Sequence, residues 1–169
     1  MTIRRVLITG MSGTGKSAAV RELAARGHQA HDLDTPEWSE WVVADPADAL
    51  TPAAGKDWVW QEERVRALLS RPGEGLLFVS GCAENMERFY PLIDTVILLS
   101  APLATIMERL AARSLDGYGH MAEERRKVTD LIATIEPLLR ESADHEIDAR
   151  QPIAATVDAI LRLAQSVMA

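Results

Sequence analysis

Short apolar runs alternate with longer stretches of helical periodicity along most of the chain. β-branched and apolar residues predict strands over Ile3–Thr9, Gln29–Leu33, Leu76–Val79 and Thr95–Leu99, with a weaker strand at Glu146–Ile147. Apolar residues at helical spacing predict helices over Ser17–Arg26, Asp57–Ser70, Pro102–Arg113, Ala122–Arg140 and Pro152–Val167. Continuous apolar strands separated by helices are typical of a parallel sheet covered on both faces, so we expect an α/β fold.

The segment 35–56 follows neither period and contains several prolines. We expect it to form a helix and loops that leave the sheet, so that the whole excursion covers about residues 35–70. All four tryptophans fall inside it, at Trp38, Trp41, Trp58 and Trp60. On a helix, Trp38 and Trp41 would share a face. The rings suit either a ligand pocket or a small satellite core.

The clearest chemical signal is the segment Gly10-Met11-Ser12-Gly13-Thr14-Gly15-Lys16-Ser17, which matches the pattern G-x-x-x-x-G-K-[ST]. Glycines let the loop amides, including those of Ser12, Gly13 and Thr14, converge on phosphate oxygens. Lys16 supplies a mobile positive charge and Ser17 a hydroxyl for Mg²⁺. A glycine-rich turn is the alternative, but a strand before and a helix after the segment indicate an ATP- or GTP-binding loop.

Asp32 and Asp34 lie at the end of the second predicted strand. Because ligands of parallel sheets bind at the carboxyl edge of the strands, both side chains would face the same crevice as Lys16. One carboxylate can hold Mg²⁺ through water, and the other can accept a proton from an attacking hydroxyl. The alternative is a pair of turn-forming aspartates that cap a helix near Pro36.

Composition narrows the class of protein. With 169 residues, 47% hydrophobic, the chain suits one domain, and its net charge of −7 argues against nucleic acid as a partner. The single cysteine, Cys82, excludes an intrachain disulfide and favours the cytoplasm. No apolar run approaches the roughly 20 residues of a membrane span, so we expect no membrane association. Oligomeric state is not predicted.

The loop, the Asp32 and Asp34 pair, the strand ending in Ser80-Gly81-Cys82 and the arginine-bearing helix after 95–99 resemble one family. The chain is similar to the shikimate kinase and nucleoside-monophosphate kinase branch of P-loop kinases, including small AAA-family ATPases labelled shikimate-kinase-like. The resemblance implies one domain over residues 1–169 with a three-layer P-loop NTPase fold and a five-stranded parallel sheet in the order 2-3-1-4-5. Shikimate kinases carry three glycines where this chain has Ser80-Gly81-Cys82, so the acceptor is not identified.

The resemblance also implies roles for individual residues. Asp32 would be the magnesium-linked aspartate beside Ser17, and Asp34 the acceptor-binding base. Arg64 would grip an anionic acceptor, Arg109 and Arg113 would flank the adenine and enter a lid, and the loop from Asp148 to Gln151 would edge the adenine. Further candidates for the acceptor pocket are Trp38, Gly81 and Arg88.

The lid would cover about residues 113–126, where small residues are flanked by cations. A segment that closes over transferring phosphates requires such a composition, and a solvated turn with surface charges is the alternative. We therefore predict an ATP- and Mg²⁺-dependent phosphotransferase acting on a small-molecule acceptor. The alternative is a nucleotide-dependent switch, but Ser80-Gly81 stands where a switch ATPase usually has an acidic residue.

Overall fold

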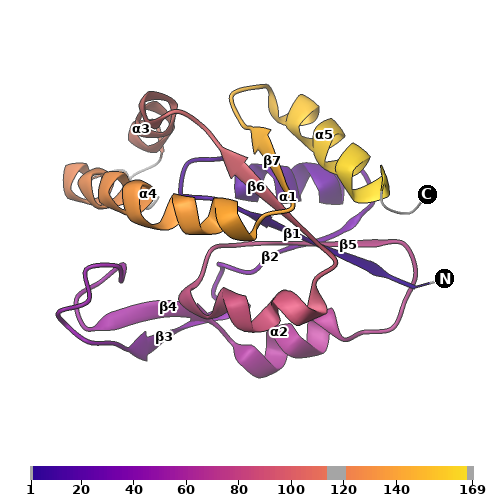
Figure 1. Ribbon diagram of the computed structural model, residues 1–169, viewed down its shortest axis with the longest axis horizontal. Helices are drawn as coiled ribbons and strands as arrows, with labels where there is room; N and C mark the ends of the chain where they lie inside the picture. Colours follow the sequence, from indigo (N-terminus) through magenta and orange to yellow (C-terminus); the bar gives the residue numbers. More distant parts are fainter. Residues whose placement is uncertain (1, 114–120, 167–169) are drawn as a thin grey trace.

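The central feature of the computed structural model, which describes residues 2–113 and 121–166, is a parallel sheet in the order β2-β5-β1-β6-β7 (Figure 1). Its strands are β1 (Arg4–Thr9), β2 (Gln29–Asp32), β5 (Leu76–Ser80), β6 (Thr95–Ser100) and β7 (His145–Asp148). When these parallel strands alone are counted along the chain, the order is 2-3-1-4-5. The predicted sheet and fold class are therefore confirmed.

Helical segments lie between the strands, and periodicity predicts each of them except η1, with α2 shorter than expected. They are α1 (Lys16–Ala25), α2 (Glu62–Leu69), the 3-10 segment η1 (Glu84–Leu92), α3 (Leu103–Ala111), α4 (Ala122–Ser142) and α5 (Ile153–Ser166). Gly27, with φ of +89°, ends α1 because it adopts the left-handed conformation and lets His28 N donate to Leu23 O at 3.0 Å. Among the described helices, none is both long and apolar enough to cross a bilayer.

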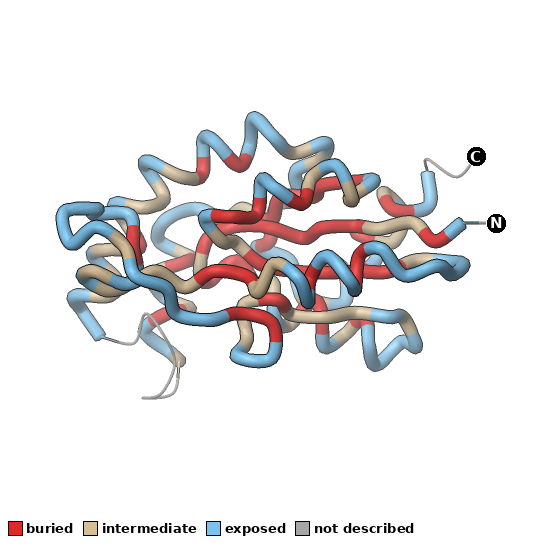
Figure 2. Tube along the Cα trace, turned by 90° about the horizontal axis from the view of Figure 1, so that it is seen from below, coloured by how far each residue is buried: buried red, intermediate tan, exposed pale blue. Residues whose placement is uncertain are grey.

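Helices cover both faces of the sheet, because successive strand residues point to opposite faces. Residues such as Ile8, Phe78 and Ile97 pack against α1 and α5. On the other face, residues such as Leu7 and Val79 pack against α2, η1 and α4. Figure 2 shows the resulting layers, with buried strand residues in the interior and exposed residues on the outer sides of the helices.

The segment 35–70 differs from the sequence-based expectation, because its first part is a hairpin and not a helix. Strands β3 (Ser39–Val43) and β4 (Lys56–Trp60) pair antiparallel and form a separate two-stranded sheet. Aromatic and β-branched residues dominate both strands and favour cross-strand pairing. Trp41 and Trp58 are opposite each other, with ring centroids 5.0 Å apart.

Two further expectations change with the hairpin. The helix expected over 57–70 begins only at Glu62, because residues up to Trp60 belong to β4. Trp38 and Trp41 do not share a helix face, because Trp38 lies in a turn and Trp41 in β3; Trp38 is 6% exposed and Trp41 is 54% exposed. The central part of the expected lid, residues 114–120, lies outside the described residues.

Candidate active site

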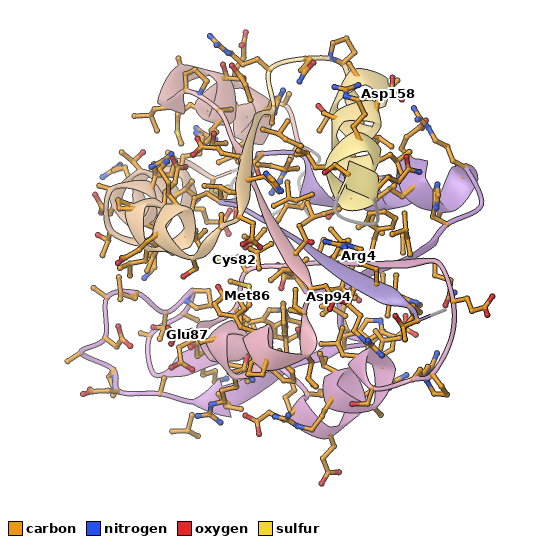
Figure 3. The ribbon with its side chains drawn as sticks, turned by 45° about the vertical axis from the view of Figure 1, so that its right-hand side comes forward. Arg4, Cys82, Met86, Glu87, Asp94 and Asp158 are labelled. Carbon is orange, nitrogen blue, oxygen red and sulfur yellow. The ribbon has the colours of Figure 1, made fainter. Side chains whose placement is uncertain are left out.

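Three neighbouring strands bring the predicted site residues to one edge of the sheet. β1, β2 and β5 are parallel, so their carboxyl ends meet there. The phosphate loop follows β1, Asp34 follows β2, and Cys82 follows β5. In Figure 3, Cys82 lies toward this end of the strands and Arg4, which begins β1, toward the other end. Open α/β sheets bind their ligands at the carboxyl edge.

In the phosphate loop between β1 and α1, side chains of the loop donate hydrogen bonds to its own main-chain carbonyl oxygens. Lys16 Nζ donates to the carbonyl oxygens of Gly10 at 2.6 Å and Met11 at 3.1 Å, and Thr14 Oγ1 donates to Met11 O at 2.7 Å. Gly13 has φ of +85°, and a Cβ there would lie 3.0 Å from Ile106 of α3. The loop backbone therefore requires glycine both for its conformation and for its close approach to α3.

The predicted metal ligands are in contact with each other. Ser17 Oγ donates to Asp32 Oδ2 at 2.7 Å, and the main-chain N of Asp34 donates to Asp32 Oδ1 at 3.1 Å. A hydroxyl and a carboxylate are oxygen donors of the kind Mg²⁺ prefers. No group of three or more metal-binding side chains occurs in residues 2–113 or 121–166. A magnesium ion at Ser17 and Asp32 would therefore take its remaining ligands from phosphate and water.

Ser80 supports the resemblance and argues against a switch ATPase, but no role in this site was predicted for it from the sequence. It is the register partner of Asp32 on the adjacent strand. Its hydroxyl is buried and makes no hydrogen bond within the described part of the chain. An unpartnered buried hydroxyl beside Asp32 is consistent with a site that also holds water or a hydrated ion. A serine at the end of a strand gives no signal of this kind in the sequence.

Asp34 is held by protein donors on both carboxylate oxygens. Trp60 Nε1 donates to Oδ1 at 3.0 Å, and the main-chain N of Cys82 donates to Oδ2 at 3.0 Å. Burial raises the pKa of Asp34 above its ordinary value, while the positive charge of Lys16 and these two donors oppose the rise. Asp34 is also linked to the phosphate loop, because its main-chain N and Ser17 Oγ both donate to the Asp32 carboxylate.

Gly81 lies against Asp34 rather than in an open pocket. A Cβ at this position would be 2.7 Å from Asp34 Oδ1 and 2.8 Å from Trp60 Cζ2. A glycine is therefore required where the segment after β5 contacts both Asp34 and Trp60. The sequence suggested instead that Gly81 contacts an acceptor. Burial also raises the pKa of the adjacent Cys82 thiol, so the thiol is neutral at neutral pH.

A cavity of about 240 Å³ adjoins the phosphate loop. Its lining includes Gly13, Gly15, Arg109, Arg113 and Gln151. Arg109 donates to the carbonyl oxygens of Gly13 and Ala149 and so connects α3 with the loop and with the segment after β7. Burial lowers the pKa of Arg113 below its ordinary value. Three of the predicted residues outside the loop, Arg109, Arg113 and Gln151, therefore meet at one cavity with the loop.

Asp148 is not part of that cavity lining. Its carboxylate is exposed and pairs with Arg150 at 2.5 Å. The same hydrogen bonds lower the pKa of Asp148. Of the loop from Asp148 to Gln151, the structure brings Ala149 and Gln151 to the cavity.

A larger cavity of about 830 Å³ lies between the hairpin, the start of α2 and η1. It is lined by Glu40, Val42, Val59, Trp60, Gln61, Glu62, Glu63, Arg64, Glu84, Asn85 and Arg88. Neither Asp34 nor Lys16 is in this lining, and Trp60 contacts both the cavity and Asp34. The predicted acceptor residues Arg64 and Arg88 are therefore brought together with each other, but not with Asp34.

Both arginines of the larger cavity already have carboxylate partners. Arg64 lies 3.8 Å from Glu37, and its guanidinium stacks over the Trp38 ring at 5.0 Å. Arg88 pairs with Glu62. Because the cavity also contains several glutamates, the structure gives no excess of positive charge there for an anionic acceptor.

Fold and phosphate loop together define an α/β domain of the P-loop class, with the sheet order of the P-loop kinase fold. Residues 6–129 match the family described as an AAA domain, and the chain belongs to this family. A comparison with curated proteins gives no match.

Solved structures, among them two whose titles name a kinase, share the fold over nearly the whole chain. Shikimate kinase from Acinetobacter baumannii in complex with shikimate has a TM-score of 0.64 at 21% identity, covering 97% of this chain and 94% of that chain. A gluconokinase from Sinorhizobium meliloti 1021 has a TM-score of 0.59 at 18% identity, covering 98% and 95%. TT1252 from Thermus thermophilus has a TM-score of 0.61 at 18% identity, covering 100% of both chains. At identities this low, the structural likeness establishes a shared fold and nothing more.

Proposed function

We propose that the protein is an ATP-dependent phosphotransferase that moves the γ-phosphoryl group to a hydroxyl of a small-molecule acceptor. The observation that carries this proposal is the hydrogen-bonded link from the phosphate loop to Asp34: Ser17 Oγ donates to Asp32 Oδ2 at 2.7 Å, and the main-chain N of Asp34 donates to Asp32 Oδ1 at 3.1 Å. Phosphoryl transfer needs these groups together, because its catalysis consists mainly of positioning and charge stabilisation.

In the proposed complex, the amides of the phosphate loop and the amino end of α1 bind the phosphates. The Lys16 ammonium exchanges the Gly10 and Met11 carbonyl oxygens for phosphate oxygens. The nucleotide base occupies the cavity lined by Arg109, Arg113 and Gln151. Ser17 and Asp32 would hold Mg²⁺, which would neutralise part of the phosphate charge when bound.

Asp34 orients the acceptor and removes its proton. The free side of its carboxylate accepts a hydrogen bond from the acceptor hydroxyl. The hydroxyl oxygen then bonds to the γ-phosphorus while the bond from phosphorus to the β-phosphate oxygen breaks. ADP leaves with the electron pair, and the hydroxyl proton passes to Asp34. Arg113 stabilises the charge that develops on the transferring group.

The likeness to kinases named for shikimate and gluconate supports a small hydroxylated acceptor. The test measures ADP formation with Mg-ATP while nucleosides, sugars, acidic metabolites and hydroxylated antibiotics are added in turn. We expect one class to raise ADP formation and to yield a phosphorylated product by mass spectrometry. Lys16→Ala should abolish turnover, and Asp34→Asn should keep ATP binding but lose transfer. A flat response to every acceptor would overturn the proposal and favour a nucleotide-dependent switch.

A further inference from the structure

Two indole N–H groups from β4 converge on Asp34. Trp58 and Trp60 are two residues apart on the strand, so their side chains leave the same face. Trp58 Nε1 donates to the main-chain carbonyl oxygen of Asp34 at 2.8 Å. Trp60 Nε1 donates to the carboxylate oxygen Oδ1 at 3.0 Å. The hairpin therefore holds both the main chain and the side chain of the proposed base.

The Trp60 indole is fixed in place by its surroundings. The residue is 0% exposed, and its ring packs on Phe89 with the centroids 5.4 Å apart. Asn85 of η1 holds the Trp60 main chain from both sides: its Oδ1 accepts from Trp60 N at 3.1 Å, and its Nδ2 donates to Trp60 O at 2.9 Å. A donor locked in this way fixes the orientation of the carboxylate to which it is bonded.

The donors around Asp34 also determine which lone pairs of its carboxylate stay available to a further donor. A carboxylate has about four acceptor positions. Trp60 occupies one on Oδ1, and the Cys82 amide lies 3.0 Å from Oδ2 and 3.3 Å from Oδ1. The positions that these two donors do not occupy are the ones to which an acceptor hydroxyl can donate.

We propose that Trp60 is a positioning residue of the phosphoryl transfer: it holds the Asp34 carboxylate in the one orientation that receives the acceptor hydroxyl, with Asn85 and Trp58 supporting it. The inference rests on the proposed function, because it takes Asp34 as the base. Trp60 itself does not contact the reacting atoms. Its contribution is transmitted through one hydrogen bond to a buried charge, a bond stronger than an ordinary one.

The first test separates the hydrogen bond from the packing of the ring. Trp60→Phe keeps an aromatic ring beside Phe89 but removes the N–H group. We expect kcat to fall about 10-fold or more, while the KM for ATP stays within about 2-fold, because only the interaction with Asp34 is lost. Trp41→Phe is the matched control, since it makes the same chemical change in the same hairpin at an exposed ring.

The second test needs neither activity nor a folded Trp60 variant. Tryptophan indoles labelled with ¹⁵N give one N–H signal each, and a hydrogen bond to a charged acceptor shifts that signal. We expect Asp34→Asn to move the Trp60 indole signal strongly. The Trp58 signal should move less, because Trp58 donates to the main-chain carbonyl of Asp34, which the substitution retains. The Trp41 signal should stay in place.

The outcomes distinguish the two proposals. The positioning role is overturned if Asp34→Asn leaves the Trp60 indole signal unmoved. It is also overturned if Trp60→Phe turns over at the rate of Trp41→Phe while Asp34→Asn is inactive. Wild-type transfer by Asp34→Asn, together with a moved Trp60 signal, would instead reject Asp34 as the base and leave the hydrogen bond established.

Discussion

Replacing Gly81 with alanine would place a methyl group between the three elements that meet at Asp34. The added Cβ would lie 2.7 Å from Asp34 Oδ1, 2.8 Å from Trp60 Cζ2 and 3.0 Å from Trp60 Nε1. Neither neighbour is the free end of a flexible chain, since Trp60 is fully buried and Asp34 is bonded on both oxygens. Both side chains must move, and the hydrogen bond between them must lengthen.

The cost follows from the overpacking of a rigid site. Insertion of one methyl group into a well-packed interior typically destabilises a protein by about 1–3 kcal/mol. In a domain of this size, that loss lowers the melting temperature by about 2–12 °C. Displacement of the Asp34 carboxylate should also reduce phosphoryl transfer by about 10-fold or more, while ATP binding at the separate phosphate loop is preserved.

The assay is urea unfolding of Gly81→Ala and the wild type, followed by tryptophan fluorescence and repeated as a thermal melt. Gly73→Ala is the control, because its Cβ would meet only Ile3, at 3.4 Å and beyond. We expect its free energy of unfolding to stay within about 1 kcal/mol of the wild type. Equal unfolding midpoints for Gly81→Ala and the wild type would refute the packing argument at Asp34.

Three further predictions concern other parts of the molecule. Arg109→Met removes the hydrogen bonds to the carbonyl oxygens of Gly13 and Ala149, so calorimetry should show ATP binding weakened by about 10-fold, and unchanged affinity would contradict the assigned role. For Ser17→Ala, ATP affinity is measured once with Mg²⁺ and once with EDTA. The ratio of the two affinities should be about 10-fold smaller than in the wild type, and an unaltered ratio would show that Ser17 does not bind the metal. Burial lowers the pKa of His31 below 6.5, so the unfolded chain binds more protons than the folded one as pH falls past that value. The stability of the wild type relative to His31→Gln should therefore decline from about pH 8 to about pH 5 in urea titrations, and a constant difference would exclude this linkage.

The sequence-based prediction of a helix and loops over residues 35–56 was wrong, because it rested on periodicity alone. Segment 35–56 combines prolines with a strand of only five residues, Ser39–Val43, which a local pattern does not separate from a loop. The partner strand, Lys56–Trp60, is 13 positions away and supplies the pairing that makes both segments extended. Strand pairing is a contact between distant residues, so its stabilisation is not present in either segment by itself.

The sequence by itself determined the phosphate loop and its chemistry. All the residues from Gly10 to Ser17 are contiguous, and the required glycine conformations and the start of α1 are local properties. The alternation of apolar strands and helices likewise determined the class of fold, because the central strands β5, β1 and β6 bury both faces.

Only the tertiary structure decided what surrounds Asp34. Its partners Trp58, Trp60 and Cys82 come from positions 24 to 48 residues further along the chain, and no spacing rule connects them. The same structure paired Arg64 and Arg88 with glutamates in a separate cavity, although the sequence suggested that they face the acceptor beside Asp34. Which side chains donate hydrogen bonds to a buried carboxylate depends on how the strands and loops pack. That packing depends on contacts throughout the core, not on local sequence.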